Sequence, residues 1–148
     1  MAYRQIVVGT DGSDTATGAV REAAALAAAL GAKLTVVTAY AHDPATDRAA
    51  ADAPDEVRWR VTDAAEANER ARQGSDVARG AGATNVDVYV EAGEPSAVVI
   101  EAAELRRADC IVVGSKGMTG AKRFLLGSVP NKISHHAPCD VLIVHTAP

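Results

Sequence analysis

Five short β-rich runs, separated by longer helical segments, limit the fold of this chain more than any other feature. The runs are Gln5 to Gly9, Lys33 to Ala39, Val86 to Val90, Asp109 to Gly114 and Asp140 to His145. Three of them are near-continuous apolar sequences, which is typical of strands covered on both faces in a parallel sheet. The run from Val86 to Val90 alternates apolar and polar residues, so we expect it at an edge of the sheet.

The segments between the runs predict four helices. Ser13 is a candidate N-cap for a helix that runs to Leu30 and stops at Gly31. The residues of this helix expected to face the sheet are Ala16, Ala19, Val20, Ala23, Ala27 and Leu30. The other three helices are expected over Glu56 to Arg79, from Pro95 or Ser96 to about Arg107, and over Ser128 to His136. This alternation predicts a doubly wound α/β fold with right-handed crossovers.

Length and composition indicate one domain spanning residues 1–148. The net charge of −4 argues against a nucleic-acid partner. No apolar run approaches the roughly 20 residues that span a bilayer, so we expect a cytoplasmic protein with no membrane partner.

Cys110 and Cys139 lack metal-ligand spacing and are interpreted as buried, reduced thiols. Because they precede strands expected to be neighbours, a disulfide between them under oxidation is the alternative.

A ligand site is expected where the strand order of such a sheet reverses, beyond the carboxyl ends of the strands. The common arrangement places the first and fourth strands there, which directs attention to the residues after Gly9 and after Val113. Asp11 follows the first strand, where a carboxylate can accept hydrogen bonds from ribose hydroxyls or hold a cation beside phosphates. The alternative is that Asp11 caps the first helix.

Glycines follow the fourth strand in the segment that begins at Gly114. Glycine lets backbone N–H groups approach an anion, and the helix that opens at Ser128 carries a partial positive charge at its start. A phosphate chain is therefore expected between Gly117 and Ser128, with Lys116 adding positive charge. Neither the P-loop pattern nor the dinucleotide fingerprint G-x-G-x-x-G occurs in the sequence.

The same segment resembles the universal stress proteins that bind ATP. Their motif G-x2-G-x9-G-[ST] reads here as Gly114-SK-Gly117-MTGAKRFLL-Gly127-Ser128, with every fixed position matched. The opening IVVGTDGS, from Ile6 to Ser13, also resembles the family, and the resemblance covers essentially the whole chain.

The resemblance implies a flavodoxin-like, or Rossmann-like, three-layer sandwich with strand order 3-2-1-4-5. It also implies a homodimer that pairs the last strands through Val141, Leu142, Ile143, Val144 and His145. Thr10 and Asp11 match positions near the ribose and phosphates, and Ala39 matches a position whose backbone bonds adenine. Gly114 matches a ribose-side contact. Gly117, Gly127, Ser128 and Val129 match the phosphate-side contacts. Lys116 and Met118 complete the predicted nucleotide-binding residues.

The resulting hypothesis is a stress-response regulatory protein that binds an adenine nucleotide, with ATP favoured. Mg²⁺ or Mn²⁺ would bind through the phosphates, with Asp11 as the candidate protein ligand, and the regulatory partner is unknown. No catalytic residue is identified, and His135 and His136 are interpreted as structural because they lie near a helix C-terminus. The alternatives are a cyclic AMP-binding stress protein, a slow ATPase or nucleotidyl or phosphoryl transferase, and a dimeric interaction protein that needs no ligand.

Overall fold

The computed structural model describes residues 3–41, 54–115 and 128–145, and side chains in the segment 54–63 are outside the description. The strands are β1 (Gln5–Gly9), β2 (Lys33–Tyr40), β3 (Val86–Ala92), β4 (Cys110–Gly114) and β5 (Asp140–Val144). The described helices are α1 (Asp14–Leu30), α3 (Pro54–Gly80), α4 (Pro95–Leu105) and α5 (Ser128–His136).

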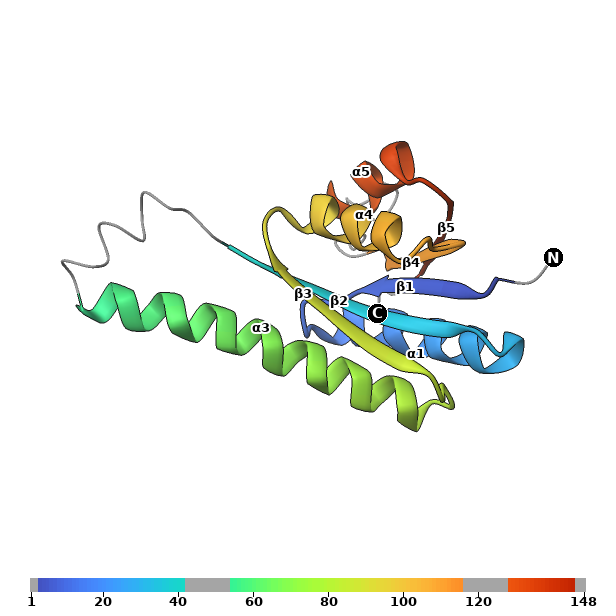
Figure 1. The fold of residues 1–148 in the computed structure, drawn as a ribbon, viewed down its shortest axis with the longest axis horizontal. Coiled ribbons are helices and arrows are strands. Elements are labelled where there is room, and N and C mark those ends of the chain that lie inside the picture. The colour runs from blue at the N-terminus through green and yellow to red at the C-terminus, as the bar shows by residue number, and fades with distance from the viewer. Residues whose placement is uncertain (1–2, 42–53, 116–127, 146–148) are drawn as a thin grey trace.

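The five strands form one parallel sheet in the order β3-β2-β1-β4-β5 (Figure 1). The predicted doubly wound fold and the 3-2-1-4-5 order are therefore confirmed, and β3 lies at an edge as expected. The chain leaves β1 toward β2 on one side and returns to β4 on the other. The reversal of strand order thus falls between β1 and β4, as predicted.

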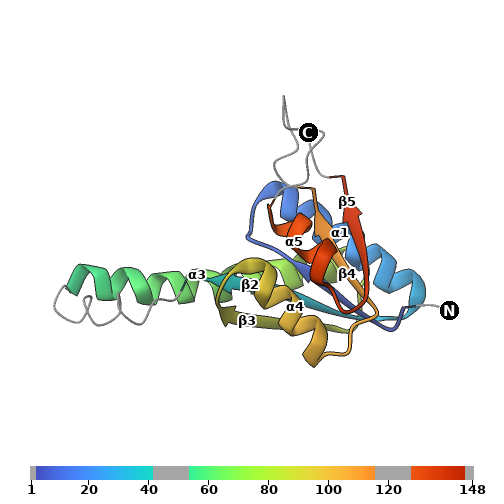
Figure 2. The ribbon, with the colours of Figure 1, turned by 90° about the horizontal axis from the view of Figure 1, so that it is seen from above.

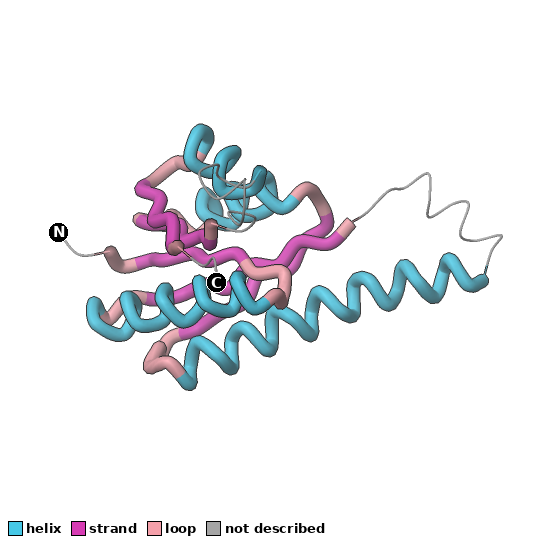
Figure 3. The backbone as a smooth tube through the Cα atoms, turned by 180° about the vertical axis from the view of Figure 1, so that it is seen from behind, coloured by secondary structure: helices cyan, strands magenta, loops and turns pink. Residues whose placement is uncertain are grey.

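Two hydrophobic clusters cover the two faces of the sheet. Ile6 and Val8 of β1 belong to the cluster under α1 and α3, whereas Val7 belongs to the cluster under α4 and α5. Figures 1 and 3 show these helix pairs on opposite sides of the strands. Because side chains alternate across a strand, a continuous apolar run supplies both cores at once. The buried alanines of α1, Ala19, Ala23, Ala24 and Ala27, let that helix lie close to the sheet.

Of the residues of α1 predicted to face the sheet, Ala16 is only half-buried, and Leu30 was assigned wrongly. It is 37% exposed, because it is the last residue of the helix and the chain turns away at Gly31, which has a φ of +67°. The buried Ala24 was not predicted. Other element ends differ from expectation by one or two residues, such as β2, which extends to Tyr40.

The two cysteines lie on opposite faces of the sheet. Cys110 is fully buried in the cluster under α1 and α3, and the partly buried Cys139 packs against the cluster under α4 and α5. Both thiols are free, as interpreted from the sequence. The alternative of a disulfide between them under oxidation stays a prediction.

Within the described part of the chain, no helix combines the length and the apolar character that crossing a membrane requires. The longest described helix, α3, extends well beyond the end of the sheet (Figure 2).

Candidate functional site

A cavity of about 180 Å³ lies beyond the carboxyl ends of β1 and β4, at the reversal of strand order. This is the place where open α/β sheets bind ligands. Its lining residues come from β1, β2, β4 and the helices α1, α4 and α5. They are Gly9, Thr10, Asp11, Ala16, Val37, Ala39, Pro95, Val99, Val113, Gly114, Val129 and Pro130.

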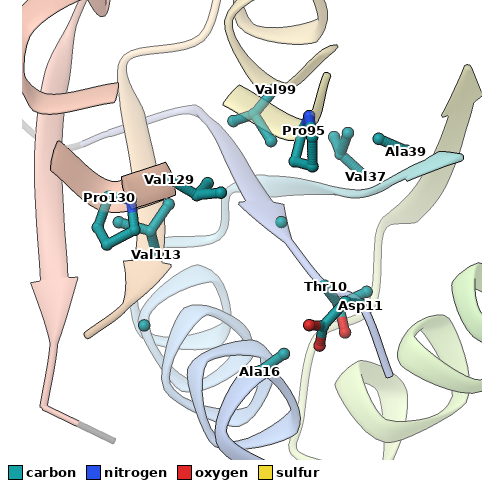
Figure 4. Close-up of a pocket in the computed structure, with 12 residues that line it drawn as sticks. Thr10, Asp11, Ala16, Val37, Ala39, Pro95, Val99, Val113, Val129 and Pro130 are labelled. Carbon is teal, nitrogen blue, oxygen red and sulfur yellow. The ribbon is translucent and has the colours of Figure 1, made fainter. Parts of the chain in front are cut away.

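The turn from β1 to α1 holds the polar end of the cavity. Thr10 is tied to β2, because its N–H donates to Val37 O at 2.9 Å and its carbonyl accepts from Thr38 Oγ1 at 3.1 Å. The N–H of Gly12 donates to Thr10 Oγ1 at 3.1 Å, and Gly12 has the positive φ of +83° that favours glycine. Figure 4 shows the oxygens of Thr10 and Asp11 together at this end.

Asp11 shapes the turn and is not the N-cap of α1. Its Oδ1 accepts the N–H of Ser13 at 2.9 Å, which is an Asx-type turn. Ser13 is the cap: its Oγ accepts the N–H of Ala16 at 3.2 Å, as the sequence predicted. The alternative role of Asp11 as the helix cap is therefore wrong, and its exposed carboxylate lines the cavity.

An apolar wall faces this polar turn. Val37 and Ala39 of β2 and Pro95 and Val99 of α4 gather on one side of the cavity (Figure 4). Gly9 approaches this wall closely, since a Cβ added to it would lie 3.1 Å from Val99 Cγ2. A side chain at Gly9 would therefore collide with Val99, and the glycine lets α4 pack directly against the end of β1.

The α5 side of the cavity is formed by Val113, Val129 and Pro130 (Figure 4). The middle of α5 is tied to the start of α4, because Lys132 Nζ lies 3.6 Å from Oε1 of Glu94, the N-cap of α4. The hydroxyl of Ser96 donates to Glu94 and, as the largest cause, lowers the pKa of that carboxyl.

Five of the residues singled out from the sequence line the cavity: Thr10, Asp11, Ala39, Gly114 and Val129. Ser128 opens α5 beside Val129 and is exposed. The other four, Lys116, Gly117, Met118 and Gly127, lie outside the described residues.

Sequence reasoning missed the contribution of α4. Pro95 and Val99 line the cavity because α4 covers the carboxyl end of β2 as well as following β3. Pro95 carried a usable signal, since a proline at the first turn of a helix marks the point where the chain leaves the strand ends.

Among residues 3–41, 54–115 and 128–145, no group of three or more histidine, cysteine or acidic side chains is arranged to hold a metal ion. Asp11 is the acidic side chain among the described lining residues. A single carboxylate fits a Mg²⁺ ion that is held mainly by the phosphates of a nucleotide, which is how Mg²⁺ is usually bound in such sites.

The fold and the cavity define a doubly wound α/β domain with a ligand site at the reversal of strand order. The chain matches the model of the Universal stress protein family over residues 2–145, and it belongs to that family. It is 41% identical to the universal stress protein Rv1636 of Mycobacterium tuberculosis over 145 residues, which cover 98% of each chain.

Solved structures agree with this assignment. One is a universal stress protein in complex with cAMP, with 37% identity, a TM-score of 0.75 and coverage of 99% of this chain and 100% of the other. Another is the universal stress protein from Archaeoglobus fulgidus in complex with dAMP, with 26% identity, a TM-score of 0.71 and coverage of 97% and 98%.

Proposed function

We propose that this chain is a regulatory protein of the stress response that binds an adenine nucleotide in the cavity between β1 and β4. The main observation in support is that one cavity combines an apolar wall with a polar turn that bears a carboxylate. The cAMP and dAMP complexes of its structural neighbours support the choice of an adenine nucleotide.

The two ends of the cavity suit the two ends of a nucleotide. The base would stack against Val37, Pro95 and Val99, with backbone groups near Ala39 available to its edge. The ribose would lie near Asp11, whose carboxylate can accept hydrogen bonds from hydroxyl groups. The phosphates would extend toward Ser128, at the positive end of α5.

ATP is the nucleotide that we favour, because the sequence carries every fixed position of the G-x2-G-x9-G-[ST] motif. Mg²⁺ or Mn²⁺ would then bridge the phosphates and Asp11. Cyclic AMP is the second candidate, and the observation in its favour is the 37% identity to a universal stress protein crystallised with cAMP.

The proposal includes a homodimer formed through β5. This strand is at an edge of the sheet, and Leu142 is 43% exposed there. An apolar edge strand is a site that native proteins cover. The cytoplasmic location expected from the sequence stays a prediction, as does the regulatory partner.

The test is to identify and then titrate the nucleotide. Mass spectrometry of the supernatant from the denatured, purified chain identifies any adenine nucleotide that copurifies. Calorimetric titration with ATP and with cyclic AMP, each with and without Mg²⁺, then gives the two affinities, with GTP as the control for the base.

We expect Mg²⁺-dependent ATP binding that exceeds GTP binding at least tenfold. Tighter binding of cyclic AMP, independent of Mg²⁺, would select the second candidate. Absence of binding to either adenine nucleotide would overturn the proposed function and leave a ligand-independent interaction protein.

A further inference from the structure

The turn that carries Asp11 lies between two cavities. A second cavity, of about 110 Å³, lies between this turn, α1 and α3. Its lining residues are Thr10, Gly12, Thr17, Val20, Arg70, Gln73, Gly74 and Val77. Thr10 lines both cavities, so a cavity borders the turn on two sides. The remaining contacts of the turn therefore matter more than they would in a filled core.

Helix α3 supplies two of those contacts. The aliphatic stem of Arg70 lies over Gly12, where an added Cβ would be 3.0 Å from Arg70 Cγ and 3.1 Å from its Cδ. One turn further along α3, an added Cβ at Gly74 would lie 3.4 Å from Thr10 Cγ2. The helix thus lies close to the residues on both sides of Asp11.

The charged end of Arg70 is directed along α3. Its guanidinium lies 3.6 Å from the Glu66 carboxylate, and both side chains are about half exposed, at 48% and 53%. Such an exposed pair contributes little stability. The packing of the stem on Gly12 is consequently the contact through which Arg70 acts on the turn.

We propose that Arg70 is a positioning residue for the nucleotide cavity, holding Gly12 and hence the Asp11 turn in the geometry that accepts the ligand. Helix α3 contributes none of the described residues that line that cavity, yet through Arg70 it sets part of the affinity. Such coupling is reciprocal: the factor by which the Arg70 contact raises the nucleotide affinity is also the factor by which bound nucleotide stabilises that contact. This proposal rests on the proposed function for its ligand.

The test compares three variants of the full chain. Arg70→Ala removes the stem, and Arg70→Met keeps an unbranched stem without the charge. Arg72→Ala is the matched control, because Arg72 is on the same helix, is 63% exposed and pairs with Glu69 and Asp76. The measurements are backbone ¹⁵N order parameters at Gly12 and Ser13 without nucleotide, calorimetric affinity for ATP and cyclic AMP, and Tm.

We expect Arg70→Ala to lower the order parameters of Gly12 and Ser13 from about 0.85 toward 0.6, with Tm near that of wild type. Its nucleotide affinity should fall about fivefold or more. Arg70→Met should restore both quantities, and Arg72→Ala should change neither.

The proposal would be overturned if Arg70→Ala left the order parameters of Gly12 and Ser13 and the nucleotide affinity unchanged. It would also be overturned if Arg70→Met lowered both quantities as much as Arg70→Ala. A wild-type chain that binds no adenine nucleotide would contradict the proposed function instead. The role of Arg70 in holding the turn is then decided by the nucleotide-free order parameters alone.

Discussion

Small side chains make the cavity at the ends of the strands. Gly9 has no room for a Cβ beside Val99, and Ala39 and Gly114 bring backbone to the cavity wall without bulk. Larger residues at these positions would fill the space that a ligand needs. The polar chemistry is concentrated in Thr10 and Asp11, on one turn, so the site depends strongly on single residues there.

Replacing Asp11 with alanine should weaken adenine-nucleotide binding by about 10- to 100-fold, since a hydrogen bond to a charged group contributes roughly 1.5–3 kcal/mol. Calorimetric titration measures the loss. Asp14→Ala is the control, because Asp14 is in the first turn of α1 but does not line the cavity. It should lower stability by about 0.3–1 kcal/mol through the helix dipole and leave the affinity unchanged. If Asp11→Ala and wild type bind the nucleotide with equal affinity, Asp11 does not contribute to the site.

Sequence reasoning located the residues of the site that follow strands directly. Thr10 and Asp11 could be placed because the first strand ends at Gly9 in both prediction and structure. Pro95 marked a helix start, but its place in the cavity, like that of Val99, depends on which strand α4 covers. That is a property of tertiary packing, which hydropathy and turn residues do not encode.

Helix boundaries were predictable where the sequence carries capping residues. Ser13 and Gly31 fix both ends of α1, and the structure has the predicted bounds. Helix α4 ends at Leu105, earlier than expected, because Arg107 adopts a left-handed conformation with a φ of +51°, and no glycine marks this turn in the sequence. Strand β2 is longer than its apolar run because Tyr40 pairs with Ala92 of β3, a partner that the local pattern cannot show.

The packing of α3 on β2 predicts opposite effects for two glycines of the same helix. An added Cβ at Gly74 would lie 2.9 Å from Val36 Cγ1, whereas one at Gly80 would have no atom within 4 Å. Gly74→Ala should lose up to about 2 kcal/mol, because overpacking exceeds the gain in helix propensity. Gly80→Ala should gain about 0.4–1 kcal/mol. Urea unfolding of both variants measures the difference, and stabilisation by Gly74→Ala would contradict the close packing.

The N-cap of α4 predicts a pH dependence of stability. Bonds from Ser96 and Ala97 hold the pKa of Glu94 below its usual 4.5, so the unfolded chain binds this proton more tightly than the folded chain. Glu94 therefore stabilises the fold above about pH 4.5, and this contribution is lost as the pH falls through the folded pKa.

Denaturant unfolding of wild type and Glu94→Gln from about pH 7 to pH 3 checks this expectation. Wild type should be more stable near neutral pH, and the difference should shrink toward acid. A difference that is constant across this range would show that the Glu94 charge does not stabilise the helix start.

The two edges of the sheet differ in a way that bears on assembly. At the β3 edge, Asp87 pairs with Lys33 at 3.9 Å and with Arg106 at 3.1 Å, and charges of this kind discourage strand pairing. At the β5 edge, Val141 and Ile143 pack under α4 and α5, but Leu142 faces the other way and is 43% exposed. The proposed homodimer uses the β5 edge, although Val88 of β3 is exposed to a similar extent, at 39%.

This asymmetry predicts the effect of one substitution on the oligomeric state. Leu142→Lys would place a charge in the proposed contact, where burying it unpaired costs several kcal/mol, and should convert the dimer to a monomer. Leu105→Lys is the matched control, since Leu105 is even more exposed, at 64%, but lies at the end of α4. Light scattering after size-exclusion chromatography should give a dimeric mass for wild type and Leu105→Lys, and a monomeric mass for Leu142→Lys. If folded Leu142→Lys remains a dimer, the contact between the two copies lies elsewhere. A monomeric wild type would contradict the proposed homodimer.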